Sequence, residues 1–137
     1  MATETLVAEQ WLYSVLAADT QLAAIVGTRI YAYVAPQGAT FPFVVYQNQA
    51  GRDVRGVGPL RLMANLLYVV KVVAQTNSFA TLETAANRID VVLQAASGTN
   101  VRGTVIACVR EQPFSLVEST NEGQFRHLGG IYRLWAK

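Results

Sequence analysis

The sequence predicts an α+β fold, in which a mainly antiparallel β-sheet of about four to five strands packs with two to three α-helices. Residues 62–74 are dense in β-branched and aromatic side chains, which fit the pleated surface of a strand. After Asn77 and Ser78 the apolar residues recur at steps of three and four, which is typical of a helix. Shorter apolar runs, separated by prolines and glycines, predict the remaining strands.

The helix predicted over residues 78–97 carries a single apolar stripe. Ser78 or Asn77 would cap its first amide groups, and Gly98 stands where a helix usually ends in a left-handed residue. The stripe consists of Phe79, Leu82, Ala86, Ile89, Leu93 and Ala96. Such a stripe must be buried, and the nearest partner is the preceding strand. This part of the chain is therefore predicted to form the hydrophobic core and not a catalytic site.

Two helices and two strands are predicted before the central strand. The helices cover residues 3–18 and 21–26; Asp19 or Thr20 would cap the second helix, and Gly27 would end it. The strands cover residues 29–34 and 43–49, separated by a loop over residues 35–40 that contains Pro36 and Gly38.

Two further strands are predicted near the C-terminus. Residues 101–117 form the first, interrupted near Pro113, and residues 125–135 form the second after a turn at 121–123. Gly129-Gly130 inside the last strand predicts a bulge or a close approach of another backbone.

Residues 50–61 predict a long loop between two paired strands, with three glycines, one proline and three arginines. A connection of about ten residues exceeds the usual two to five of a hairpin. Two interpretations remain open: a solvated hairpin tip, or a mobile arm that becomes ordered against a neighbouring subunit or a charged surface.

The central strand has two faces of different character. The face that suits a helix-covered core consists of Leu66, Tyr68, Val70, Val72 and Ala74. The opposite face consists of Asn65, Leu67, Val69, Lys71, Val73 and Gln75. This second face is too apolar for water and too polar for a dry core, which is typical of a subunit interface. A second layer formed by the first helix would explain it equally well.

Composition sets limits on function. The 137 residues are most simply one domain, 1–137, and only 15% of them are charged against 52% that are hydrophobic, which indicates burial against other chains. The formal charge of +2 does not by itself indicate nucleic-acid binding. The longest apolar run, Leu66–Val70, is too short to span a membrane.

Candidate catalytic residues are few. His127 is the single histidine, so neither a histidine metal cluster nor a cofactor is expected. Cys108 lies among aliphatic residues and is expected to be inert, although a Cys108–His127 pair in a small hydrolase is conceivable. The glycine-rich residues 51–58 lack the lysine and the following helix of a phosphate-binding loop.

Several segments resemble the tail-completion or tail-terminator family of long-tailed bacteriophages. The motifs are Leu16-Ala17-Ala18-Asp19, residues 22–31 with Val26-Gly27-Thr28-Arg29-Ile30-Tyr31, Ala35-Pro36-Gln37-Gly38, Phe41-Pro42-Phe43-Val44-Val45-Tyr46-Gln47, and residues 130–135. The strand and helix at the centre of the chain are similar to the same family, so the resemblance spans nearly the whole chain.

The resemblance implies a structural, non-enzymatic virion protein made in the host bacterial cytoplasm. It implies a homo-oligomeric, hexameric ring at the neck-proximal end of the tail, which stops tail-tube polymerisation. Its partners would be the tail-tube protein and the neck or connector proteins, with DNA passing through the lumen. A head–tail connector or stopper, and a small nucleic-acid-binding module, are the alternatives. The interface residues predicted from the mixed face and the loop are Arg52, Arg55, Val57, Leu67, Val69, Lys71 and Val73.

Overall fold

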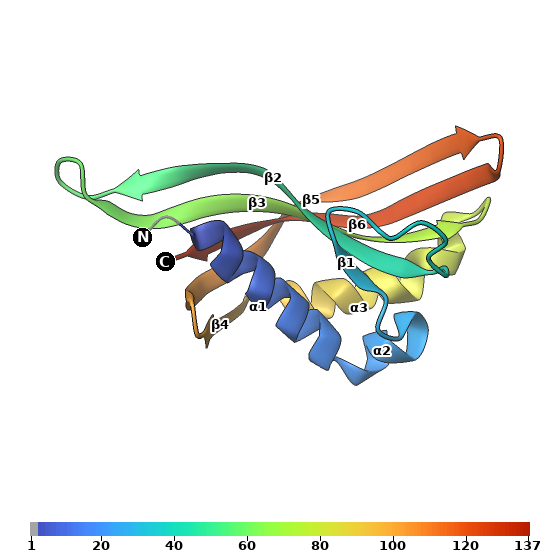
Figure 1. Cartoon of the computed structure of the whole chain (residues 1–137), viewed down its shortest axis with the longest axis horizontal. Coiled ribbons are helices and arrows are strands. Elements are labelled where there is room, and N and C mark those ends of the chain that lie inside the picture. Colours follow the sequence, from blue (N-terminus) through green and yellow to red (C-terminus); the bar gives the residue numbers. More distant parts are fainter. Residues whose placement is uncertain (1–2) are drawn as a thin grey trace.

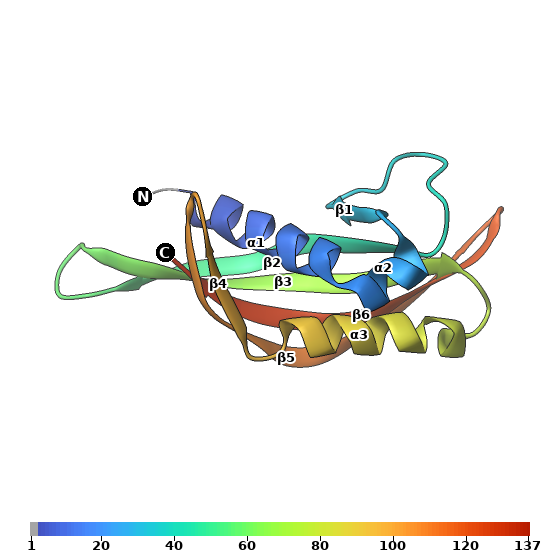
Figure 2. The ribbon, with the colours of Figure 1, turned by 90° about the horizontal axis from the view of Figure 1, so that it is seen from below.

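The computed structural model describes residues 3–137, which form one six-stranded sheet with its helices gathered on one side (Figures 1 and 2). The elements are α1 (Glu4–Ala18), α2 (Thr20–Val26), β1 (Ile30–Ala32), β2 (Phe43–Arg55), β3 (Arg61–Gln75), a 3₁₀ helix η1 (Phe79–Leu82), α3 (Glu83–Leu93), β4 (Ala96–Asn100), β5 (Gly103–Thr120) and β6 (Gly123–Ala136). The α+β prediction is confirmed, with more strands than the sequence predicts.

The strand order is β1-β2-β3-β6-β5-β4, and only the β1–β2 pair is parallel. Strands β2, β3, β5 and β6 are much longer than the others, and they run side by side in one twisted sheet (Figure 2). Beyond the helices, β2 and β3 continue as one hairpin arm, and β5 and β6 continue as a second arm at the opposite end (Figure 1).

The core lies between the inner face of the sheet and the three α-helices. The predicted inner face of β3 is buried here, with Leu66, Tyr68, Val70 and Val72 in contact with the helices. The buried side chains from the helices are Val7, Ala8, Trp11, Leu12, Leu16, Leu22, Val26, Ala85, Ile89 and Leu93. Because α1 packs on this face, the alternative in which the first helix covers the opposite face of β3 is wrong.

Local signals in the N-terminal half are confirmed with small changes. The Asp19 carboxylate accepts a hydrogen bond of 2.9 Å from the Leu22 N–H and so caps α2, and Gly27 ends that helix with a φ of 61°. Strand β1 is shorter than the predicted range of residues 29–34, because Tyr33 adopts a φ of 66°, which ends the regular strand.

The helix predicted over residues 78–97 is shorter, and its end is different. Ser78 caps η1 as predicted, since its hydroxyl accepts a hydrogen bond from the Ala80 N–H. The α-helix then ends at Leu93, where Ala95 with a φ of 62° makes the turn. Of the predicted stripe, Leu82, Ile89 and Leu93 are buried, Phe79 and Ala86 are half-buried, and Ala96 lies in a strand.

Gly98 does not end a helix but lies within β4. A Cβ atom added at Gly98 would lie 2.6 Å from Nε1 of Trp11, so glycine is needed here because α1 passes close by. Residues 96–100 pair with β5, which makes them an edge strand where the sequence predicts the end of a helix and a turn.

The predicted loop over residues 50–61 is mostly regular strand. β2 continues to Arg55 and β3 begins at Arg61, so the connection is only residues 56–60. Gly51 faces Leu66 across the hairpin, and a Cβ atom there would lie 2.8 Å from a Leu66 methyl group. The glycine serves close packing rather than a turn, and the segment is an extended β-hairpin.

The C-terminal strands are longer than predicted. β5 is continuous through Pro113; the irregularity predicted there is a bulge between Arg110 and Gln112. The paired glycines of β6 mark a close backbone approach, because a Cβ atom at Gly129 would lie 2.1 Å from the Val70 carbonyl oxygen.

Candidate assembly interface

The outer face of the sheet is covered only in part, and within residues 3–137 no helix lies on it (Figure 2). Toward the β5–β6 arm the loop between β1 and β2 folds over β2 and β3, and Phe43, Val45 and Val73 are buried beneath it. The loop residues packed there are Ala35, Ala39 and Phe41, together with Tyr31 of β1. Part of the apolar character that predicts a subunit interface is therefore satisfied inside the chain.

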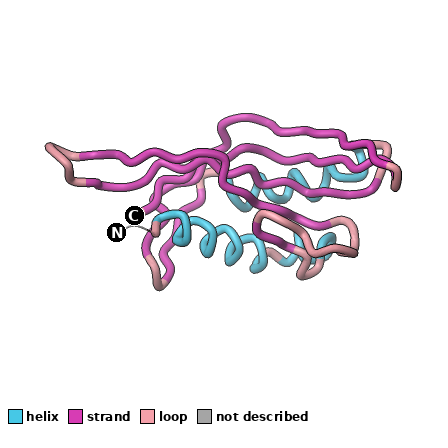
Figure 3. Tube along the Cα trace, turned by 45° about the horizontal axis from the view of Figure 1, so that its top comes forward, coloured by secondary structure: helices cyan, strands magenta, loops and turns pink. Residues whose placement is uncertain are grey.

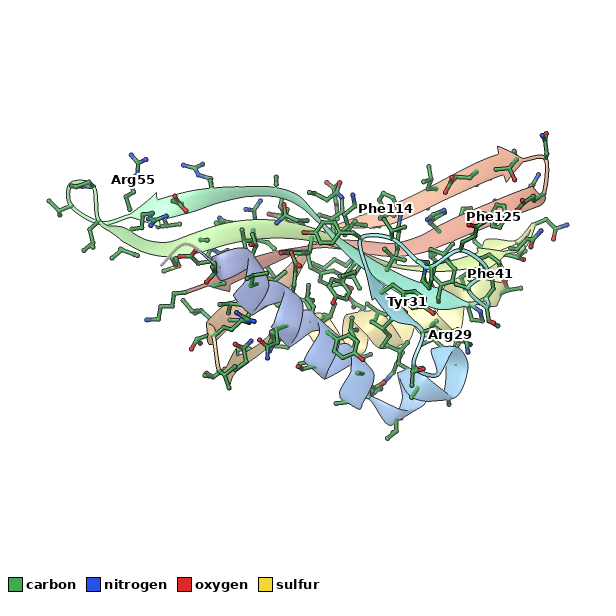
Figure 4. The ribbon with its side chains drawn as sticks, viewed as in Figure 1. Arg29, Tyr31, Phe41, Arg55, Phe114 and Phe125 are labelled. Carbon is green, nitrogen blue, oxygen red and sulfur yellow. The ribbon has the colours of Figure 1, made fainter. Side chains whose placement is uncertain are left out.

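Aromatic contacts and one arginine hold this loop in place. The Phe41 ring lies 5.2 Å from the Phe43 ring and 5.6 Å from Phe125, which comes from the β5–β6 arm (Figure 4). The Arg29 guanidinium donates a 2.9 Å hydrogen bond to the Pro42 carbonyl oxygen. These contacts fix the loop against two neighbouring parts of the sheet.

A groove of about 360 Å³ lies between this loop and the β5–β6 arm. Its lining residues are Tyr33, Val34, Ala35, Phe41, Phe43, Val45, Lys71, Val73, Glu118, Thr120, Phe125 and His127. Most of these are apolar, and three of them, Lys71, Glu118 and His127, can carry a charge near neutral pH.

The ionisable groups of the groove are Lys71, Glu118 and His127. Burial lowers the pKa of Lys71, whose ammonium group stands 5.5 Å from the centre of the Phe114 ring. Burial, and then the charge of Lys71, lower the pKa of His127, although Oε1 of Glu118 lies 2.5 Å from its Nε2 atom. The groove lacks a cysteine or serine nucleophile beside this histidine.

The conceivable Cys108–His127 pair does not form. Cys108 is fully buried in the core on the helix side, and burial raises the pKa of its thiol to about 12. His127 lines the outer groove and faces Leu116 of β5, far along the strand from Cys108. An unreactive, structural thiol is the expected result of this placement.

The predicted interface residues fall into two groups. Arg52 and Arg55 are exposed on the β2–β3 arm, where Figure 4 shows Arg55 extending away from the helices, and Val57 at its tip is 100% exposed. On the outer face of β3, Val69 and Val73 are only 2% and 5% exposed.

The two remaining predicted residues on β3, Leu67 and Lys71, are half-buried. The arm residues lie on the β2–β3 arm, whereas Lys71 and Val73 line the groove, which lies toward the β5–β6 arm. The structure therefore does not bring the predicted interface residues together in one site. Sequence reasoning missed Phe41, Phe125 and Glu118, because only the pairing of β5 with β6 and the path of the loop bring them to this face.

The part of the chain that the structure describes shows neither a metal-binding cluster nor a membrane-spanning helix. Across residues 3–137 no cluster of three or more histidine, cysteine, aspartate or glutamate side chains is arranged to hold a metal ion. None of the helices described is long and apolar enough to cross a membrane.

These features define a class: a structural subunit built for assembly, with long exposed arms and a partly apolar sheet face. The family model for the tail completion protein gp17 matches residues 10–128, and the chain belongs to this family. Tail completion is a structural, non-enzymatic role, as the sequence motifs indicate.

A solved structure has the same fold. A chain in the "Virion of native gene transfer agent (GTA) particle" matches with a TM-score of 0.75 and 20% sequence identity, covering 99% of this chain and 98% of that chain. A search of curated proteins found no match.

Proposed function

We propose that the chain assembles into a homo-oligomeric, hexameric ring at the neck-proximal end of the tail. The ring stops polymerisation of the tail tube and joins the tail to the neck or connector proteins, with DNA passing through its lumen. Membership of the tail completion family supports this role. The observation that carries the ring is the pair of arms projecting from opposite ends of one sheet (Figure 1).

A closed ring needs heterologous contacts, in which one surface of a subunit meets a different surface of the next. The two arms provide two such surfaces. They also carry exposed apolar side chains at both ends of the molecule, including Val57, Leu60 and Leu62 on one arm and Leu116 and Val117 on the other. Exposed apolar groups gathered in this way favour a protein partner.

The outer face of β3 gives a further surface for a partner. Val69 and Val73 are already buried within the chain, so Leu67 and Lys71 are the predicted interface residues that a neighbour can still cover. Arg133 on β6 lies opposite Leu67 and is bound to the side chains of Glu111 and Asn65.

The test uses the purified chain and the tail-tube protein of the same particle. Native mass spectrometry of the chain alone is expected to show a closed ring. Added to polymerising tube protein, the ring is expected to shorten the tubes and to label one end of each tube in electron micrographs. Binding to purified neck proteins without any effect on tube length would instead support the connector or stopper role. A chain that stays monomeric and leaves tube length unchanged would refute the proposal.

A further inference from the structure

The β2–β3 arm has an unpaired strand edge. β1 pairs with β2 only over residues Val44–Tyr46, and within the described part of the chain no strand lies beside β2 from Gln47 to Arg55. Residues 49–53 of this edge are exposed. An exposed edge of this length presents a row of backbone N–H and C=O groups that can pair with another strand.

The β5–β6 arm has the second unpaired edge. β4 pairs with β5 only as far as Cys108, and the Arg110 N–H donates to the Gln94 side chain, so among residues 3–137 the edge from Glu111 to Thr120 is also without a neighbouring strand. All residues of that stretch except Phe114 are exposed. In Figures 1 and 3 these edges belong to different arms, at opposite ends of the molecule.

The two arms differ in charge. The β2–β3 arm carries Arg52, Arg55 and Arg61 against a single acid, Asp53, which lies 4.0 Å from Arg61. On the free edge of β5, residues 111–120 carry Glu111 and Glu118, and Glu122 lies in the following turn; the basic side chains of this arm, Arg126 and Arg133, lie on the neighbouring strand β6. One edge is therefore basic and the other acidic, which favours contact between unlike arms.

We propose that the free edge of β2 in one copy pairs with the free edge of β5 in the next copy, so that the sheet continues from subunit to subunit. The inference rests on the proposed ring and specifies its contact. β2 runs parallel to β6 and therefore antiparallel to β5, so neighbours of similar orientation bring the two edges together as an antiparallel pair. Main-chain hydrogen bonds supply the binding energy, and the charges select the partner.

The charge pattern is tested with two double variants. Arg52→Glu/Arg55→Glu makes both edges acidic, and Glu118→Lys/Glu122→Lys makes both edges basic. Each variant alone is expected to lose the ring at low salt, because like charges then meet at every contact. An equimolar mixture is expected to recover rings in which the two variants alternate, giving an even number of subunits by native mass spectrometry.

The control reverses a charge elsewhere. Arg102→Glu changes an exposed arginine in the turn between β4 and β5, and it is expected to leave ring formation unchanged. Rings formed by either double variant alone, or no rings from their mixture when each variant is folded by circular dichroism, would overturn the proposal. If the arginines of the β2–β3 arm faced DNA and not a neighbouring subunit, Arg52→Glu/Arg55→Glu alone would still form rings.

Strand pairing itself is tested with a proline. Pro113 has no N–H to donate to β6, so its nitrogen faces the free edge of β5. The backbone N–H groups of every second residue point to the same edge of a strand, so the Val117 N–H also faces the free edge. Val117→Pro removes that donor and leaves the bonds to β6, so it is expected to abolish the ring. Val117→Thr keeps the N–H and is expected to assemble normally. Normal rings from a folded Val117→Pro protein would refute pairing through this edge.

These outcomes separate the two proposals. If the unaltered chain forms no ring and leaves tube length unchanged, the proposed function fails. If it forms rings and shortens tubes while all the edge variants behave like it, only the edge pairing fails.

Discussion

Leu93 tests whether the helix-covered face of the sheet is the main core. It is the last residue of α3, is 0% exposed, and lies in the cluster that joins the three helices to the sheet. Leu93→Ala removes about three methylene equivalents at about 0.8 kcal/mol each, or roughly 2.4 kcal/mol. The cavity left behind adds to this, so we expect the free energy of unfolding to fall by about 2–5 kcal/mol.

The assay is urea unfolding followed by circular dichroism, at one fixed protein concentration because assembly adds to apparent stability. The urea concentration at the midpoint of unfolding should fall, while the slope of the unfolding free energy against urea concentration should stay the same. Val91→Ala is the matched control, since Val91 lies on the same helix and is 64% exposed. Its effect should stay within about 0.5 kcal/mol. A Leu93→Ala change as small as that of the control would show that this face is not the core.

Three further outcomes are expected. Gly129→Ala should destabilise the fold strongly, because the new methyl group meets the Val70 carbonyl oxygen at 2.1 Å; thermal unfolding measures this. Cys108 should not react with a thiol reagent until the protein unfolds, and Cys108→Val should leave assembly unchanged. The hydrogen bond from Arg88 lowers the pKa of Asp19, so its stabilising effect should be present above the ordinary value of 3.8 and be lost as pH falls further; Asp19→Asn and the unaltered protein should therefore converge in stability only in acid.

Local signals in the sequence predict much of the inner layer. The steps of three and four locate the buried side of α3, and the cap at Asp19 with Gly27 defines α2, because both depend on residues close in sequence. β4 could not be predicted in this way. Residues 96–100 contain no apolar β-branched or aromatic side chain, and they become a strand only because β5 lies beside them.

Glycine is the main source of error in the strands. Gly51 and Gly98 look like breaks in regular structure, yet each lies within a strand where a neighbouring side chain passes too close for a Cβ atom. The groove could not be predicted from the sequence either, because it depends on contacts between residues far apart in the chain. Phe41, Phe125 and His127 meet through strand register and the path of a loop, and neither leaves a periodic pattern in the sequence.

The charges on the two arms bear on which contact the free edges make. A strand edge can in principle pair with a second copy of itself, which gives a closed two-fold dimer, or with the other edge, which leaves both ends open for a ring. Pairing of two β2 edges would bring together Arg52 and Arg55 of both copies, and pairing of two β5 edges would bring together their Glu118 and Glu122 side chains. Both like-edge contacts are repulsive, while the unlike contact is attractive. In the proposed ring, the same arginines and glutamates would therefore disfavour like pairs and direct head-to-tail assembly, the arrangement that a ring requires.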